Sequence, residues 1–201
     1  MSEVFYEEIS GIYRLKVPFD TVYTSVFLLT AENGNIMVDC ATTAYDVDNF
    51  ITPALRTLGY KLSDIDTIVI SHRHSDHAGG LDRLMALAPY IEVIMDTRDL
   101  GNGISTYSLP GHTLDCIGVL DERTATLITA DGLQGAGVDK YRCSLKSIEA
   151  YLKTIETLRA DERIQNLLFS HAYEPWYSDR AIGRYEVLER LSDCISVLKA
   201  E

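Results

Sequence analysis

The sequence predicts an α/β (α+β) chain folded as a four-layer αββα sandwich, in which helices cover the outside of two packed sheets. Three observations support this fold class. Strand-like apolar runs open the chain, helical patterns are interleaved with later strands, and the whole falls into two halves. The chain has 201 residues, of which 46% are hydrophobic, so it is most simply one domain, 1–201, with a full core.

The first half is rich in strands. Its β-branched and apolar runs predict strands at 11–17, 24–30, 35–38, 67–70 and 91–95. Residues 45–58 carry a helical pattern that ends at Gly59, and Pro53 either kinks this helix or starts a second piece. A shorter helical pattern occupies residues 81–87. The first half of the chain thus has strands followed by helices, which is the order expected of the sandwich.

The second half mixes strands with longer helices. Its apolar runs predict strands at 104–109, 117–120, 126–129 and 166–169, the middle two forming a hairpin. Ser144 is the expected N-cap of a helix with apolar positions Leu145, Ile148, Leu152, Ile155 and Leu158. A last helix is expected to carry Ile182, Tyr185, Leu188, Leu191, Ile195 and Leu198. We expect Leu188, Leu191 and Ile195 to face the core, as the stripe of an amphipathic helix does.

A dense run of histidine and aspartate follows one of the predicted strands. Residues 71–77 have the sequence Ser-His-Arg-His-Ser-Asp-His. Imidazole and carboxylate are the ligands that borderline divalent metals prefer. Because alternate side chains of an extended segment point the same way, His72 and His74 can converge on one metal. Asp76 and His77 follow where the chain turns and can reach a second metal nearby, which is a better account than a solvated loop.

The remaining histidines also stand at the ends of predicted strands. The chain has five histidines, and the two outside the dense run are His112 and His171. Asp39 and Asp131 follow predicted strands in the same way. Polar residues at the ends of several strands are how α/β folds build sites on their loops. These four residues are therefore candidates for the same site.

At this point the sequence resembles the metallo-β-lactamase fold superfamily. Its motifs stand in the family's order, namely Asp39, the run His72, His74, Asp76 and His77, then His112 in Pro-Gly-His-Thr, Asp131 and His171. The resemblance covers about residues 10–175, nearly the whole chain, and implies a sandwich of the metallo-β-lactamase type.

The resemblance also implies which residues would hold two metal ions. The first ion would be held by His72, His74, His112 and Asp131. The second would be held by Asp76, His77, Asp131 and His171, so that Asp131 bridges the two. Asp39 would lie behind these ligands and orient one of them or a bound water. The implied cofactors are two divalent metal ions per chain, zinc as the first expectation and iron or manganese as alternatives.

Two departures from the family pattern concern the site. Many members have glycine before the bridging aspartate and before the last histidine, where this chain has Ala130 and Ser170, whose Cβ atoms restrict the backbone. The stretch from Gly80 to His112 is also short for the family, which usually has an extra helix and strand there. A pocket wall is then missing, so either the monomer has a shallow open site or a second subunit covers it in a homodimer.

The implied activity is that of a dinuclear metal-dependent hydrolase that uses a metal-bridging hydroxide. Asp76 and Asp131 are the catalytic candidates, because either carboxylate can relay a proton. Lactamases of the common type have Cys where Asp131 stands, so we expect a small ester, thioester or lactone instead of an antibiotic. Tyr141, Arg142 and Tyr173 are the candidate substrate contacts.

Several alternatives stay open. One is an iron-dependent redox or oxygenase member of the same fold, and another is a hydrolase of β-lactams or phosphodiesters. A non-catalytic binding protein is a further class, disfavoured because a binding module has no need of a complete ligand set for two metals.

Composition and charge limit the partners. The formal net charge of −12 makes nucleic acid an unlikely partner, because phosphate backbones bind to Lys and Arg surfaces. The N-terminus lacks an apolar targeting segment, and no run approaches membrane-spanning length. Four scattered cysteines, Cys40, Cys116, Cys143 and Cys194, are expected to be reduced thiols, two of them (Cys40 and Cys143) near the site. We therefore expect a cytoplasmic protein acting on a small molecule.

Overall fold

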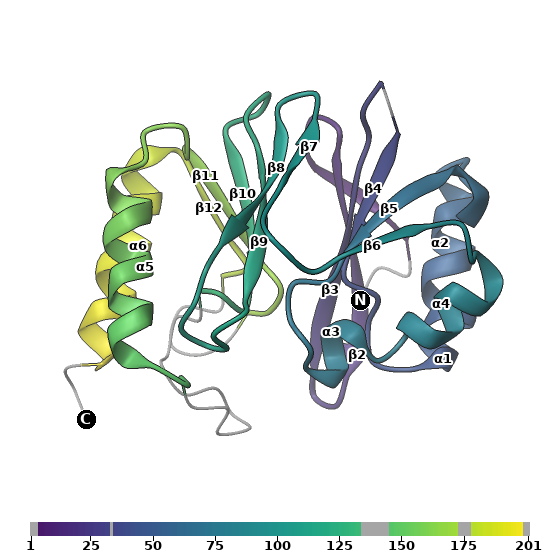
Figure 1. The fold of residues 1–201 in the computed structure, drawn as a ribbon, viewed down its shortest axis with the longest axis horizontal. Coiled ribbons are helices and arrows are strands. Elements are labelled where there is room, and N and C mark those ends of the chain that lie inside the picture. The colour runs from purple at the N-terminus through teal and green to yellow at the C-terminus, as the bar shows by residue number, and fades with distance from the viewer. Residues whose placement is uncertain (1–3, 33, 134–144, 173–177, 199–201) are drawn as a thin grey trace. The chain divides into compact units, whose positions relative to one another are not determined.

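The computed structural model describes residues 4–32, 34–133, 145–172 and 178–198 (Figure 1). The chain divides into two compact units, Met1–Met95 and Asp96–Glu201. Each unit has one six-stranded sheet with helices against it, and each is described here by itself. The single-domain organisation 1–201 stays a prediction.

The sheet of the first unit changes from antiparallel to parallel along its width. Its strands, in spatial order, are β1 (Tyr6–Ile9), β2 (Ile12–Phe19), β3 (Val22–Leu29), β4 (Asn35–Val38), β5 (Ile65–Val69) and β6 (Glu92–Ile94). β1 to β4 pair antiparallel, whereas β4, β5 and β6 are parallel to one another. Because parallel strands end at the same edge of a sheet, residues that follow β4 and β5 lie together, as ligand-binding residues do in open α/β sheets.

The two longer α-helices of the first unit, α2 (Thr52–Thr57) and α4 (Leu81–Leu87), lie against one face of this sheet (Figure 1). The other helical elements of this unit are α1 (Ala44–Asp46), a π-helical segment (Val47–Ile51) and the short α3 (Ser75–Ala78), with a 3-10 turn at Leu62–Asp64. The helix expected at 45–58 is present in three continuous pieces, and Pro53 stands in the first turn of α2. The prediction that Pro53 starts a second piece is confirmed.

The sheet of the second unit is antiparallel except for one pair. Its strands, in spatial order, are β12 (Arg180–Ile182), β11 (Asn166–Phe169), β10 (Thr126–Ala130), β9 (Ile117–Asp121), β8 (Ile104–Ser108) and β7 (Asp99–Gly101). β10 and β11 are the parallel pair, so their following residues share one edge of the sheet. The hairpin expected at this place is formed by β9 and β10.

Two helices, α5 (Ile148–Ala160) and α6 (Arg184–Leu198), lie side by side against this second sheet (Figure 1). The expected N-cap Ser144 is a wrong prediction for α5. The cap is Ser147, whose hydroxyl accepts a hydrogen bond from the Ala150 backbone N–H at 3.1 Å, and Leu145 precedes the helix. Serine three residues further along offers the same capping chemistry and stands directly before the first helical turn.

The last helix begins later than expected. Ile182 ends β12, and Gly183, with φ 87°, separates this strand from α6. The fully buried positions of α6 are Val187, Leu191 and Cys194, while Leu188 is half-buried and Tyr185 is exposed. Of the three residues expected to face the core, Leu191 is buried and Ile195 packs against the core. The buried face of α6 therefore begins at Val187 and not at the expected Leu188.

Each unit has its own hydrophobic core between sheet and helices. In the first unit Met37 and Ile68 of the sheet pack with Ile51, Leu55 and Leu84 of the helical layer. The second core contains, among others, Leu127, Leu167, Tyr151, Ile155, Leu158 and Leu191. Cys40, Cys116 and Cys194 are buried free thiols, as predicted, whereas Cys143 lies outside the described residues.

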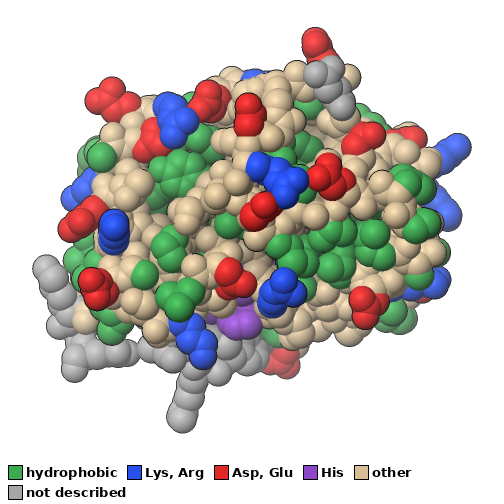
Figure 2. All heavy atoms as spheres, in the orientation of Figure 1, with side chains coloured by type: hydrophobic (Ala, Val, Ile, Leu, Met, Phe, Trp, Pro, Cys, Tyr) green, Lys and Arg blue, Asp and Glu red, His purple; other side chains and the backbone are tan. Residues whose placement is uncertain are grey.

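On the face drawn in Figure 2, basic side chains of the described residues are interspersed with acidic ones and form no continuous basic patch. None of the helices in the described ranges is long and apolar enough to cross a membrane.

Candidate metal centre

The loop after β5 gathers the histidines of the first unit. His72 and His77 are buried, and His74 is half-buried. The ring centroids of His72 and His74 lie 4.6 Å apart, and those of His72 and His77 lie 4.3 Å apart. Asp76 continues the group, with one carboxylate oxygen 3.3 Å from Nε2 of His77. The four ligands predicted within residues 72–77 therefore do converge.

A buried carboxylate lies behind these imidazoles. Asp39 follows β4, and its Oδ2 is 2.7 Å from Nδ1 of His77. Its two oxygens also accept hydrogen bonds from Ser71, Oδ1 from the backbone N–H and Oδ2 from the hydroxyl, each at 2.8 Å. The hydroxyl oxygen of Ser71 lies 3.1 Å from Nδ1 of His72. Asp39 thus has the place behind the ligands that the resemblance implied.

The chain around Asp39 is fixed by close backbone packing. Asp39 and Ala41 have left-handed φ angles of 62° and 59°, which bend this segment toward α3. The N–H of Cys40 donates to the carbonyl of His77 at 2.8 Å. A Cβ atom on Gly79 would overlap the carbonyl oxygen of Thr42. Glycine at this position is therefore required by the close approach of two backbones.

Cys40 lies next to the site, as expected, but its chemistry is that of a buried thiol. Its Sγ donates to the carbonyl oxygen of His77 at 3.3 Å. Burial, followed by the Asp39 carboxylate, raises the pKa of the Cys40 thiol well above its ordinary value. A thiol that stays protonated is a poor metal ligand, so Cys40 supports the loop without joining the ligand set.

The second unit brings its three predicted ligands together around Asp131. The carboxylate follows β10, and one of its oxygens, Oδ1, is 3.3 Å from Nε2 of His171, which follows β11. The other oxygen, Oδ2, is 3.7 Å from Nε2 of His112. All three residues are buried. A carboxylate with a different imidazole beside each oxygen is the arrangement expected of a shared ligand.

Backbone geometry and one helix hold this second group. Ala130 has φ 47°, a left-handed angle that an alanine adopts only with strain, whereas Ser170 has no such angle. The loop that carries His112 is tied to the start of α5, because the Ser147 N–H donates to the carbonyl of Gly111 at 3.2 Å. A Cβ atom on Gly111 would lie 2.7 Å from the side chain of Tyr151, so glycine is needed there too.

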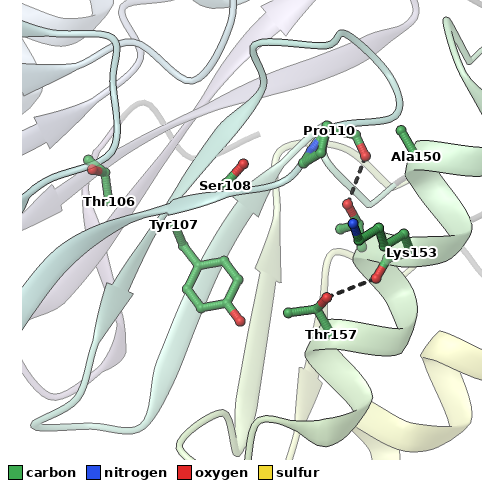
Figure 3. A pocket seen from close by; sticks show the side chains of 8 residues that line it. Thr106, Tyr107, Ser108, Pro110, Ala150, Lys153 and Thr157 are labelled. Atoms are coloured by element: carbon green, nitrogen blue, oxygen red, sulfur yellow. Dashed lines mark hydrogen bonds between the residues drawn. The ribbon is translucent and has the colours of Figure 1, made fainter.

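A hollow of about 610 Å³ in the second unit lies apart from these ligands, between β8 and α5 (Figure 3). It is lined by Thr106, Tyr107, Ser108, Pro110, Ala150, Lys153, Thr154 and Thr157. Burial, then the nearby Asp161 carboxylate, raises the pKa of Tyr107 to about 12, so its hydroxyl remains a donor. The hydroxyl of Thr154 donates to the carbonyl of Pro110 at 2.7 Å and so helps to fix the chain just before His112. Of the predicted site residues that the structure describes, none lines this hollow.

The outcome for the predicted site residues differs by region. The structure groups Asp39 with the four ligands of the first unit, and His112 and His171 with Asp131 in the second. Tyr141, Arg142 and Tyr173 lie outside the described residues. Ser71 was not predicted as a site residue. Its signal in the sequence was a hydroxyl directly before the first histidine of the run.

The donor set fits borderline divalent metals. It consists of imidazole nitrogens and carboxylate oxygens, without thiolate. Nδ1 of His77 faces a carboxylate and Nδ1 of His72 faces a hydroxyl, which is the outer support that metal-binding histidines have. Nε2 is then the candidate ligand atom of His72 and of His77.

Sequence comparison finds relatives that match part of the chain. A family model described as the metallo-beta-lactamase superfamily matches residues 19–100. A hydroxyacylglutathione hydrolase of Pseudomonas putida (strain W619) is 26% identical over 154 residues, which cover 63% of this chain and 59% of that enzyme. The match thus spans about three fifths of the relative's length.

Structural comparison extends the likeness along nearly the whole chain. A metallo-beta-lactamase from Erythrobacter litoralis is 18% identical, with a TM-score of 0.71 and coverage of 98% of both chains. The metallo-beta-lactamase FIM-1 from Pseudomonas aeruginosa, solved in a mono-zinc form, is 15% identical with a TM-score of 0.72 and covers 96% of this chain and 95% of its own. The predicted αββα fold class is confirmed by these matches. The chain is thus similar to the metallo-β-lactamase superfamily in sequence over residues 19–100 and in fold along nearly its whole length.

Proposed function

We propose that the protein is a dinuclear metal-dependent hydrolase that acts on a small ester, thioester or lactone. The observation that carries the proposal is the environment of Asp131, whose two oxygens face Nε2 of His112 and of His171 at 3.7 and 3.3 Å. A carboxylate shared in this way is what a pair of neighbouring ions requires. Similarity to hydroxyacylglutathione hydrolases supports an ester-like or thioester-like substrate.

The proposed centre uses the seven ligands that the family resemblance implies. His72, His74, His112 and Asp131 would hold one ion, and Asp76, His77, Asp131 and His171 the other. All seven side chains carry a nitrogen or oxygen donor suited to zinc, iron or manganese, and zinc is the ion we propose. Within each unit the members of these sets already lie close together.

The chemistry that two such ions supply when bound is a water with a pKa near about 7 and a polarised substrate oxygen. The chain's own groups then have to position the ligands and move a proton. Asp76 is the better proton carrier, because its side chain is 13% exposed whereas that of Asp131 is 6% exposed and lies between two imidazoles. Asp131 would remain a ligand throughout.

The test is a substrate panel on the full chain loaded separately with zinc, manganese and iron. Esters, thioesters and lactones are compared with β-lactams and phosphodiesters, each with and without oxygen. We expect oxygen-independent hydrolysis of the first group, with a rate that rises through neutral pH as the water ionises. Activity confined to oxygen-dependent chemistry would replace the hydrolase with the iron redox alternative.

Two further measurements on the same preparations complete the test. Elemental analysis should find transition metal in the purified chain, and none after incubation with zinc would contradict the proposal. Light scattering measures whether the chain forms the homodimer that would cover a site left open by the short Gly80–His112 segment. A monomer active on large substrates would favour the open site.

A further inference from the structure

The hydroxyl group of Ser71 connects two parts of the first ligand group. Ser71 is fully buried. Its Oγ lies 2.8 Å from Oδ2 of Asp39 and 3.1 Å from Nδ1 of His72. The same Oδ2 lies 2.7 Å from Nδ1 of His77. One carboxylate oxygen thus reaches one imidazole directly and a second imidazole through a hydroxyl.

The fold brings these groups together through the parallel pairing of β4 and β5. Val38 at the end of β4 is in register with Val69, so the residues that follow both strands lie side by side. The backbone N–H of Asp39 donates to the carbonyl of Val69 at 2.9 Å. The backbone N–H of Ser71 in turn donates to Oδ1 of Asp39. The carboxylate is therefore held in one orientation from both sides.

The directions of the protons in this chain of contacts follow from elementary chemistry. A carboxylate accepts hydrogen bonds and has none to donate, so the single proton of the Ser71 hydroxyl points to Asp39. The hydroxyl oxygen then has only lone pairs left for His72, and Nδ1 of that ring has to be the donor. The reverse direction would place two acceptor oxygens 2.8 Å apart with no proton between them. His77, facing Oδ2 directly, is also a donor at Nδ1.

We propose that Ser71 is a positioning residue through whose hydroxyl Asp39 acts on His72. Asp39 acts on His77 directly, so one buried carboxylate sets the tautomer of both imidazoles. Both rings then carry their proton on Nδ1 and present the lone pair of Nε2. In the proposed centre His72 and His77 serve different ions, so Asp39 and Ser71 together would prepare one ligand for each. Only this consequence rests on the proposed function.

The first test is made on the unchanged full chain without metal. Two-bond nitrogen–proton correlation spectra of the histidine-labelled protein, recorded at a pH well above the usual imidazole pKa of about 6.5, report which nitrogen carries the proton. We expect Nδ1–H for both His72 and His77. A proton on Nε2 of His72 would overturn the proposal, whatever the variants do.

Variants separate this relay from a merely structural role. In Asp39→Asn the amide oxygen can still accept from the Ser71 N–H, which places the amide N–H₂ toward the Ser71 hydroxyl and His77. An amide donor there reverses both hydrogen bonds, so we expect both imidazoles to move their proton to Nε2. In Ser71→Ala we expect His72 alone to lose its tautomer preference. An Asp39→Asn protein in which His77 changes and His72 does not would show that no relay exists.

Metal affinity provides the second readout. Loss of outer support costs roughly 10- to 100-fold in metal affinity. We therefore expect Ser71→Ala to weaken zinc binding by that factor and Ser71→Thr to keep the tautomer and the affinity. Ser75→Ala, at an exposed position at the start of α3, should change neither. An unchanged zinc affinity in Ser71→Ala would contradict the proposed consequence. Correct tautomers in a chain that binds no metal would instead overturn the hydrolase proposal and leave the relay standing.

Discussion

The two units supply their candidate ligands in opposite ways. In the first unit four ligands come from one short segment, residues 72–77, after a single strand. In the second unit His112, Asp131 and His171 each follow a different strand and lie far apart in the sequence. The first group is therefore specified mainly by a local motif, and the second by the order and register of a sheet.

This difference decides what each group depends on. The candidate ligands within residues 72–77, here called the local group, depend on the segment around Asp39 that packs against Gly79 and Gly80, here called their platform. The dispersed group needs its strands and connections to end at the same place, which the parallel pairing of β10 with β11 provides. A local motif is consequently sensitive to changes in the platform beneath it, and a dispersed group is sensitive to changes anywhere along the connections.

The largest effect on metal content is expected at Asp131, the proposed bridging ligand in the second unit. The comparison is with Asp76 of the first unit, which is proposed to bind one ion. We expect Asp131→Asn to lose both proposed ions and Asp76→Asn to lose one, because Asp131 is the proposed bridge between them. Loss of an ion worth several kcal/mol lowers the hydrolysis rate by roughly 10³-fold. Metal analysis and rate measurements check this, with the exposed Asp115→Asn as the matched control. Two ions retained by Asp131→Asn would rule out the bridging role.

The next effect compares the two glycines that let backbones approach. A Cβ atom on Gly79 would overlap the carbonyl of Thr42, and one on Gly111 would lie 2.7 Å from Tyr151. Each Gly→Ala change should lower the free energy of unfolding by roughly 1–3 kcal/mol, the usual cost of overpacking. Urea unfolding measures it, with the exposed Ser75→Ala, at the start of the helix that Gly79 follows, as a control.

Metal affinity distinguishes these two glycine variants further. Gly79→Ala disturbs the platform of a whole ligand group, whereas Gly111→Ala disturbs only the loop of His112. We therefore expect the weaker zinc binding in Gly79→Ala. Equal loss in both variants would mean that the local group is no more dependent on its platform than the dispersed group is on one loop.

The apolar patterns identified the central strands and one edge strand, β6, and missed the other three edge strands. The runs predicted at 35–38 and 166–169 match β4 and β11, which lie inside their sheets. The strands not predicted, β1, β7 and β12, are short edge strands with mostly half-buried or exposed residues. An edge strand pairs on one side only and needs little apolar surface, so its sequence carries no clear alternation.

The same division holds at the site. The types and order of the ligands were visible in the sequence, because metal chemistry restricts which residues can serve. Their support was not visible, since it depends on contacts between distant residues. Ser71 meets Asp39 across 32 residues, and Thr154 meets Pro110 across 44. Such pairs follow from strand pairing and helix packing, which no local pattern specifies.

A smaller effect concerns the connections on which the dispersed group depends. Asp161, between α5 and β11, accepts hydrogen bonds from Arg163 at 2.7 Å and from the Tyr107 hydroxyl at 3.1 Å, and Arg163 also reaches Glu122 at 2.6 Å. This network joins segments next to β8, β9 and β11. The hydrogen bonds from Arg163, and to a lesser extent that from Tyr107, hold the pKa of Asp161 below its ordinary value.

A lowered pKa in the folded state stabilises the fold above the unfolded pKa, near about 3.9, and the stabilisation is lost as the pH falls through the folded value. Asp161→Asn should therefore cost roughly 0.5–1 kcal/mol at neutral pH, since Arg163 is half-exposed, and the difference from the unchanged protein should shrink in acid. Urea unfolding across that pH range measures it, and Asp96→Asn, which breaks a more exposed pair with Arg98, is the comparison in which a smaller change is expected. A difference that persists unchanged in acid would contradict the ionic origin.

The smallest effect on stability is expected at Ala130, which precedes Asp131 and has a strained backbone. The φ of 47° costs an alanine about 1 kcal/mol relative to glycine, but the buried methyl group contributes about 0.8 kcal/mol through burial. Ala130→Gly should therefore leave the free energy of unfolding nearly unchanged.

Glycine also frees the backbone that orients Asp131, so we expect zinc affinity to fall a few-fold while stability stays constant. Ala125→Gly, at φ 52° in the β9–β10 hairpin, is the matched control and should leave zinc affinity unchanged. Tighter zinc binding by Ala130→Gly would show that the methyl group hinders the ligand geometry, and that the glycine usual in the family is the better residue at this position.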